Sequence, residues 1–74
     1  MMTIEDLFIS LRPWLADPMT IIDIRILDPE TLELKERRIC TRYDRDLLNH
    51  MQRKVYRFTY NVNNINITIE VLDK

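Results

Sequence analysis

Apolar and polar side chains alternate along the last third of the chain, from residue 55 to residue 72. The apolar positions of this segment are Tyr56, Phe58, Tyr60, Val62, Ile65, Ile67, Ile69 and Val71. Polar residues fill most of the positions between them. Successive side chains of a strand point to opposite faces of a sheet, so a period of two is typical of strands with one buried face. The pattern therefore predicts a β-hairpin.

The register of this hairpin follows from its turn. Asn63 and Asn64 lie between the two arms, and asparagine tolerates the positive φ of a two-residue type I′ turn. The paired positions are then Val62–Ile65, Tyr60–Ile67, Phe58–Ile69 and Tyr56–Val71 on the apolar face, and Asn61–Asn66, Thr59–Thr68 and Arg57–Glu70 on the polar face. A slip of one residue would turn each apolar row toward water, so we expect this register to be firm.

A second hairpin is predicted over residues 20–39. Its first strand, residues 20–27, places Ile22, Ile24 and Ile26 at alternate positions. Pro29 suits the second position of a turn over residues 28–31, because its ring fixes the φ angle that this position needs.

The return strand of this hairpin, residues 32–39, is more polar. Glu36 and Arg38 interrupt its apolar row, which is typical of an edge strand whose charges prevent pairing with other chains. Its register stays open at this point. A four-residue loop would place Ile26 opposite Glu33, and a five-residue loop would place Ile26 opposite Leu32.

Helical periodicity occurs in two places. Thr3 is a good N-cap with Asp6 three residues later, as in a capping box, and the apolar stripe that follows is Ile4, Leu7, Phe8 and Leu11. Pro13 should end or kink this helix near Arg12. A second, short helix is predicted over residues 44–53, with Thr41 or Asp44 as its cap and an apolar face of Leu47, Leu48 and Met51.

The order of elements is therefore αββαββ within one domain, residues 1–74. We predict an α+β fold in two layers, in which a four-stranded, mainly antiparallel sheet carries both helices on one face. The other face would expose polar side chains to water, namely Asp23, Arg25, Arg57, Thr59, Asn61, Asn66, Thr68 and Glu70.

The amino-acid composition excludes several classes of function for this protein. The chain has no glycine, and phosphate-binding loops and dinucleotide-binding motifs need glycine for close approach of the backbone. Its one cysteine, Cys40, cannot form an intramolecular disulfide. We see no signal peptide and no apolar run long enough to span a membrane, so the expected location is the cytoplasm.

Catalysis is not predicted. Cys40 and His50 are each the single residue of their type, and no carboxylate spacing completes a zinc site or a nucleophile–base pair with them. We expect Cys40 to pack as a small hydrophobic residue at a strand end and His50 to lie on the exposed side of the second helix. The sequence therefore predicts a protein that is not an enzyme, with no catalytic residue, metal ligand or cofactor.

Charge is unevenly distributed although the net charge is only −1. Residues 1–34 hold seven acidic and two basic side chains, whereas residues 35–57 hold eight basic and three acidic ones. The candidate contacts to a partner or to nucleic-acid phosphates are Arg37, Arg38, Arg42, Arg45, Arg53 and Lys54. The alternative is that the two halves neutralise each other in the fold. A pI near 5.7 and a polar sheet face without aromatic stacking residues both weigh against nucleic acid.

Two further surfaces favour protein binding. Trp14 lies where the first helix should end, and tryptophan beside arginine is a frequent anchor at interfaces. The alternative is that Trp14 covers one end of the core. An open sheet edge is the second surface, because it can pair with the edge of another copy and give a symmetric homodimer.

The whole pattern resembles a group of small orphan proteins. It combines Thr3-Ile4-Glu5-Asp6-Leu7, an Ile-x-Ile-x-Ile strand that ends at Asp28, the pair Leu47-Leu48, and a closing hairpin with Phe58 and Ile65-x-Ile67-x-Ile69. This resembles proteins encoded by phages and mobile elements of gut Firmicutes. The resemblance assigns no functional residue. It implies an accessory regulator or an inhibitor of host defence, which agrees with a non-enzymatic protein-binding module. The alternative is a small nucleic-acid-binding regulator that uses residues 35–57.

Overall fold

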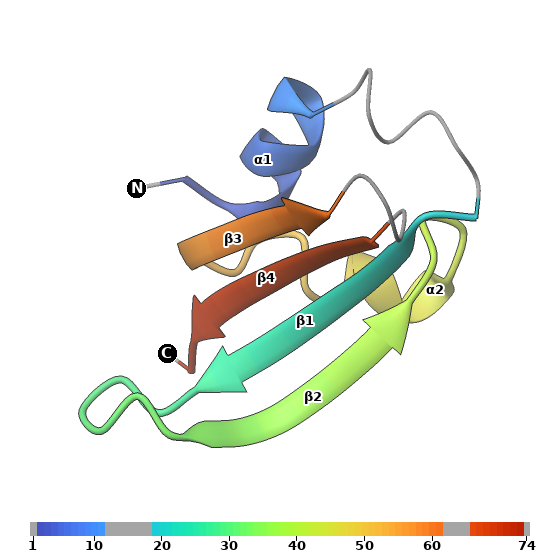
Figure 1. Cartoon of the computed structure of the whole chain (residues 1–74). Coiled ribbons are helices and arrows are strands. Elements are labelled where there is room, and N and C mark those ends of the chain that lie inside the picture. Colours follow the sequence, from blue (N-terminus) through green and yellow to red (C-terminus); the bar gives the residue numbers. More distant parts are fainter. Residues whose placement is uncertain (1, 12–18, 62–65, 74) are drawn as a thin grey trace.

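A computed structural model describes residues 2–11, 19–61 and 66–73 of the chain. It contains the predicted succession of two helices and four strands (Figure 1). The elements are α1 (Ile4–Ser10), β1 (Ile21–Leu27), β2 (Leu34–Cys40), α2 (Arg45–Leu48), β3 (Val55–Asn61) and β4 (Asn66–Leu72). The fold class is therefore α+β, as the sequence predicts.

The strands form one mixed sheet in the order β2-β1-β4-β3. Both hairpins are antiparallel, as expected, whereas the central pair, β1 and β4, is parallel. The sequence did not predict this parallel pair. The partners across the central pair are Ile22 with Ile67, Ile24 with Ile69, and Ile26 with Val71. Joining the hairpins through their two most isoleucine-rich strands buries both apolar rows at the centre of the sheet.

The register of the second hairpin is confirmed over most of its length. The observed pairs include Tyr60–Ile67, Phe58–Ile69, Asn61–Asn66, Thr59–Thr68 and Arg57–Glu70. The prediction is wrong at the start of β3, where Val55 pairs with Val71 and Tyr56 falls in a bulge. An alternating pattern does not reveal an extra residue of this kind. The predicted Val62–Ile65 pair and the Asn63–Asn64 turn lie outside the described residues.

Both predicted registers of the first hairpin are wrong, because Ile26 lies opposite Glu36. The connection is longer than expected. Asp28 Oδ1 accepts hydrogen bonds from the backbone N–H groups of Glu30 and Thr31, at 2.8 and 3.1 Å, and Leu32 adopts a positive φ of 63°. β2 therefore starts at Leu34 rather than at residue 32. Its predicted place at an edge of the sheet is confirmed.

The capping box of α1 is present as predicted. Asp6 N–H donates to Thr3 Oγ1 at 3.2 Å, and Thr3 N–H donates to Asp6 Oδ2 at 3.0 Å. The helix ends at Ser10, two residues before the predicted limit. Pro13, which was expected to end it, lies outside the described residues.

The second helix is much shorter than predicted, because α2 has four residues and ends at Leu48. The segment that follows binds the start of α1 instead. Ile4 N–H donates to the carbonyl oxygen of Arg53 at 3.1 Å, and Glu5 N–H donates to that of Met51 at 3.0 Å. The first N–H groups of a helix have no acceptor within that helix, and these bonds provide one for Ile4 and Glu5 of α1. For the segment after Leu48, the same bonds replace hydrogen bonds that a longer α2 would have made.

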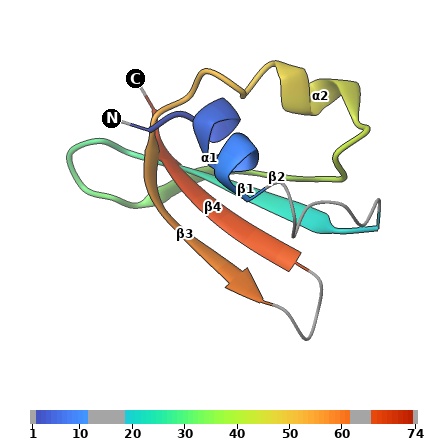
Figure 2. The same cartoon turned by 90° about the horizontal axis from the view of Figure 1, so that it is seen from above.

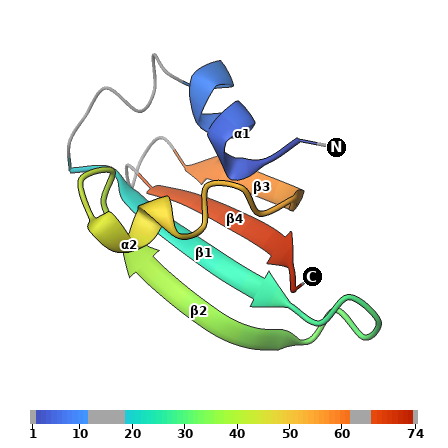
Figure 3. The ribbon, with the colours of Figure 1, turned by 180° about the vertical axis from the view of Figure 1, so that it is seen from behind.

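Both helices lie on the same side of the sheet, and the segment between α2 and β3 runs beside them (Figures 2 and 3). The core lies between the two layers. Its buried residues are Ile4, Leu7, Leu11, Ile22, Ile24, Ile26, Cys40, Leu47, Val55, Ile67, Ile69 and Val71. Tyr56 and Phe58, which belong to the predicted apolar face, are exposed.

Candidate protein-binding groove

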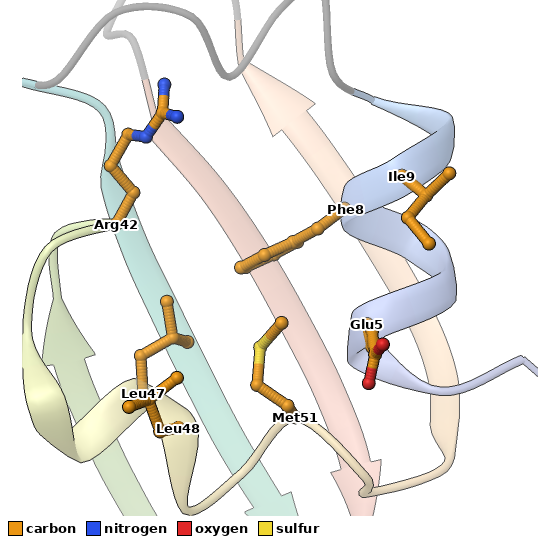
Figure 4. A pocket seen from close by; sticks show the side chains of 7 residues that line it. All are labelled: Glu5, Phe8, Ile9, Arg42, Leu47, Leu48 and Met51. Carbon is orange, nitrogen blue, oxygen red and sulfur yellow. The ribbon is translucent and has the colours of Figure 1, made fainter.

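A hollow of about 300 Å³ lies between α1 and α2, on the side of the molecule that carries the helices. We call it the interhelical groove. Its lining residues are Glu5, Phe8, Ile9, Arg42, Leu47, Leu48 and Met51 (Figure 4). In Figure 4 the side chains of Phe8, Leu47 and Met51 reach the middle of the groove from α1, from α2 and from the segment after α2. The middle of the groove is therefore apolar.

The walls of the groove follow from how each helix meets the sheet. In α1, Ile4 and Leu7 point into the core, so the following positions turn outward. Phe8 is half-buried, and Ile9 is 66% exposed. In α2, Leu47 is buried against the sheet while Leu48 is 72% exposed. Each wall thus presents one large aliphatic side chain to solvent.

Opposite charges stand on opposite sides of this apolar floor (Figure 4). Glu5, at the start of α1, accepts a hydrogen bond from the neutral side-chain amide of Gln52, with Nε2 at 2.5 Å. Arg42 lies in the connection before α2, and its guanidinium is 5.3 Å from the centre of the Tyr43 ring. Both side chains belong to exposed residues.

The six basic candidates do not form a single surface. Arg37 and Arg38 are neighbours on β2, so their side chains point to opposite faces of the sheet. Arg38 forms an ion pair with Glu36. Arg42 and Arg45 lie at the entrance to α2, whereas Arg53 and Lys54 precede β3 and line a second hollow beside Leu72.

Carboxylates already occupy part of this basic set. Asp23 was predicted to be exposed on the polar sheet face, but it is only 3% exposed. Arg37 donates to both of its oxygens, from Nε at 3.0 Å and from Nη2 at 2.9 Å, and Arg25 Nε adds a longer contact at 3.4 Å. The Arg37 hydrogen bond is the main reason why the pKa of the Asp23 carboxyl lies below its ordinary value.

The same face holds a second ion pair, in which Arg57 Nε donates to Glu70 Oε1 at 2.5 Å. Arg53 lies further away, with Nη1 3.9 Å from Asp73 Oδ1. Lys35 Nζ donates to the other oxygen of Asp73 at 2.7 Å. Acidic residues outside the basic segment thus pair with four of its bases, but among these acids only Asp23 belongs to residues 1–34.

His50 is 7% exposed, so the expectation that it lies on an exposed face is wrong. Because α2 ends early, His50 falls in the turn after the helix. Its Nδ1 accepts a hydrogen bond from Arg53 Nε at 2.9 Å, and its Nε2 is 3.7 Å from Asp46 Oδ2. These contacts hold the imidazole within the protein.

Cys40 is buried at the end of β2, as predicted. Burial raises the pKa of its thiol to about 11, and the carboxylates of Asp44 and Asp46 add to the effect. Thiolates are the reactive form of cysteine, so this thiol is a poor nucleophile at neutral pH.

No group of three or more His, Cys, Asp or Glu side chains among residues 2–11, 19–61 and 66–73 is arranged to hold a metal ion. Over the same residues, neither helix has the length and apolar character that crossing a membrane requires. Trp14, the predicted hydrophobic anchor, lies outside the described residues.

Comparison of the chain with models of protein families, with curated proteins and with solved structures finds no match. The groove therefore has to be interpreted from its own chemistry. The sequence contains a partial signal for it, because Phe8, Leu47 and Met51 belong to the two predicted apolar helix faces. Ile9 lies off the predicted stripe, and nothing in the local pattern shows that Leu48 stays outside the core.

Proposed function

We propose that this protein is a non-enzymatic protein-binding module, an accessory factor or inhibitor, and that its partner docks in the interhelical groove. One observation carries the proposal. Ile9 and Leu48 are 66% and 72% exposed on the two walls of an apolar hollow. Leaving two large aliphatic side chains in water around a hollow adds nothing to folding, whereas burying them in a complex stabilises that complex.

The charges of the groove define the chemistry of the partner. A surface that fits has an apolar ridge for Phe8 and Met51, a basic group opposite Glu5 and an acidic group opposite Arg42. Charges at the ends of an interface give orientation and faster association more than raw affinity. The apolar middle then supplies most of the binding energy.

The earlier alternatives remain predictions. Nucleic-acid binding has less support than protein binding, because the basic candidates are divided between two faces of the sheet and several of them pair with carboxylates. A phage or mobile-element origin rests on the resemblance in sequence pattern. A cytoplasmic location rests on the reasoning from cysteine use.

Binding assays on matched lysine variants test the proposal. Ile9→Lys/Leu48→Lys places charge in the groove, and Ile39→Lys/Leu34→Lys places the same charge on exposed positions of β2. Tagged wild-type and variant proteins are immobilised, then presented with untagged protein and, separately, with cell lysate treated with nuclease. Circular dichroism confirms that each variant is folded.

We expect the wild type and the β2 variant to retain the same bound protein, and the groove variant to lose at least about 90% of it, as substitutions at the centre of an interface do. Binding that is equal in the groove and β2 variants, or no protein bound in either arm, would overturn the proposal.

A further inference from the structure

A second hollow, of about 440 Å³, lies where the segment after α2 meets the end of β4. Figure 2 shows this segment running from α2 toward the end of the sheet at which β4 finishes. We call the hollow the basic hollow. Its lining residues are Asn49, Gln52, Arg53, Lys54 and Leu72, and it shares none of them with the interhelical groove. Among the described residues, the lining thus combines two positive charges, two neutral amides and one apolar side chain.

A buried histidine holds one of these cations. Arg53 Nε donates to Nδ1 of the buried His50 at 2.9 Å, and a guanidinium group can only donate, so Nδ1 carries no proton in this contact. Neither Nη group of Arg53 donates a hydrogen bond within the described residues. The carboxylate oxygen nearest to them, Asp73 Oδ1, lies 3.9 Å from Nη1, which is beyond hydrogen-bonding distance. The protein therefore fixes the Nε edge of Arg53 and leaves its Nη groups for an external acceptor.

The backbone that carries both cations is fixed as well. The carbonyl oxygen of Arg53 accepts from Ile4 N–H at 3.1 Å, and Arg53 N–H donates to the carbonyl oxygen of His50 at 3.0 Å. Lys54 forms an isolated antiparallel bridge with Thr3. The ion pairs of the described residues do not include Lys54. A fixed backbone lowers the entropy lost when a ligand binds.

We propose that the basic hollow binds the phosphate group of a small phosphorylated molecule. A phosphate monoester carries close to two negative charges near pH 7, which matches Arg53 and Lys54, whereas a carboxylate carries only one. Arginine meets phosphate oxygens with paired N–H groups, and lysine meets them as a point charge. Gln52 Nε2 donates one N–H to Glu5 and keeps a second. With the amide of Asn49, it can serve the remaining phosphate oxygens.

The rest of the hollow indicates the size of the ligand. Its volume falls within the range of roughly 300–1,000 Å³ that is typical of small-molecule sites, so it holds more than a bare ion. Leu72 is half-buried and offers an apolar wall to the part of the ligand that carries no charge. Nucleic acid is less favoured, because the lining has no aromatic side chain on which a base could stack. The site is separate from the interhelical groove, so the inference goes beyond the proposed function.

A two-dimensional NMR titration of the full chain provides the test. Isotope-labelled protein at constant ionic strength receives inorganic phosphate, glycerol 3-phosphate, glycerol or a short single-stranded DNA. We expect both small phosphates to shift the backbone amides of residues 49–54 and 72 and to saturate below about 10 mM, and glycerol to have no effect. No saturation by glycerol 3-phosphate would overturn the proposal. DNA that binds the same residues at least about 100-fold more tightly would also overturn it, in favour of nucleic acid.

Neutral substitutions identify the cations. Arg53→Gln and Lys54→Gln should each raise the dissociation constant of glycerol 3-phosphate at least about tenfold, because each removes a charge-assisted hydrogen bond. Arg38→Gln removes the same charge from an exposed position of β2 and should change the constant less than about twofold. Lys54 is exposed, so its variant remains informative if Arg53→Gln weakens the fold. Equal weakening in all three variants would show only general attraction between charges and would overturn the site.

His50 acts through Arg53 and is a positioning residue. His50→Phe removes the acceptor, so it should alter the Arg53 Nε–H resonance and raise the dissociation constant at least about threefold. His50→Gln supplies an amide oxygen as acceptor and should restore both the resonance and most of the affinity. Wild-type affinity in His50→Phe, with the resonance altered, would contradict the positioning of Arg53 on which the proposal rests.

Discussion

The two strands of the second hairpin show how much the place of a strand in a sheet matters. β3 and β4 carry the same alternating pattern, and Phe58 lies directly opposite Ile69 on the face that the helices cover. Ile69 is 0% exposed, whereas Phe58 is 42% exposed. β4 is a central strand with a neighbour on each side, and β3 is an edge strand.

The first hairpin shows the same difference. Ile24 on the central strand β1 is fully buried, while its partner on the edge strand β2 is the exposed Arg38. Each hairpin thus has a buried inner strand and a solvated outer strand. Alternation identifies which side chains share a face, but it does not show whether that face is covered at a given strand.

Truncation at the centre of the sheet should have the largest effect. Ile69→Ala removes a fully buried side chain between β1 and β3, and substitutions of this type reduce the free energy of unfolding by about 2–5 kcal/mol. A domain of this size has roughly 4–11 kcal/mol in total, so urea denaturation should detect a severely destabilised or unfolded variant. A loss below about 1 kcal/mol would contradict the central position of Ile69.

Asp23→Asn tests the polar face of the central strands. Removing the charge weakens the paired hydrogen bonds from Arg37 and should reduce the free energy of unfolding by about 1–3 kcal/mol near pH 7. Urea denaturation of the wild type and the variant measures the difference. An unchanged stability would mean that solvent replaces the arginine contacts.

The same pair of proteins should differ in acid sensitivity. The pKa of Asp23 is lower in the folded state than its ordinary value of 3.8, so the unfolded chain binds the proton more readily. The contribution of Asp23 is complete above the unfolded-state pKa and disappears as pH falls through the folded-state pKa. The stability difference between the two proteins should therefore shrink below about pH 4. A difference that stays constant down to pH 2 would contradict this linkage.

Truncation at the edge should have a smaller effect than truncation at the centre. Burial of Phe58 as a core residue would make Phe58→Ala cost about 3–5 kcal/mol. Because its side chain is partly in solvent, we expect a loss of about 1–2 kcal/mol, well below that of Ile69→Ala. Urea denaturation of the two variants side by side measures the ratio. Equal losses would contradict the difference in burial between β3 and β4.

The outer strand of the first hairpin should tolerate change best. Ile39→Thr replaces an exposed β-branched side chain on β2 with a polar one of similar shape, so its effect should stay within about 0.5 kcal/mol. Thermal unfolding should show almost no shift in Tm. A clear loss would show that Ile39 is covered in solution.

Local chemistry explains which parts of the fold could be predicted. The capping box of Thr3 and Asp6 depends on residues three positions apart, and the register of the second hairpin depends on a short turn. The register of the first hairpin could not be predicted, because the hydrogen bonds of Asp28 and the positive φ of Leu32 extend its connection. The early end of α2 was not predictable either, because the segment after it bonds to the start of α1, and the bonded residues lie 46 and 49 positions apart.

The candidate site could be predicted only in its parts. The apolar faces of both helices were recognisable, and so was the uneven distribution of charge. The six basic candidates lie close together in the sequence, whereas strand alternation separates Arg37 from Arg38 and salt bridges engage Asp23 and Asp73. Glu5 and Arg42 lie 37 positions apart in sequence, and only the packing of both helices on one sheet face brings them to a common groove.

The sequence by itself determined the number and order of the helices and strands, the apolar faces of the two central strands and most of one hairpin register. These properties depend on side-chain periodicity and on turn and cap residues, which act over a few positions. The tertiary structure alone decided that β1 and β4 pair in parallel, that Phe58 is exposed, that Asp23 and His50 are buried and that a groove opens between the helices. The physical reason is that burial and pairing between distant segments depend on which apolar surfaces meet, and a local pattern does not specify its partner.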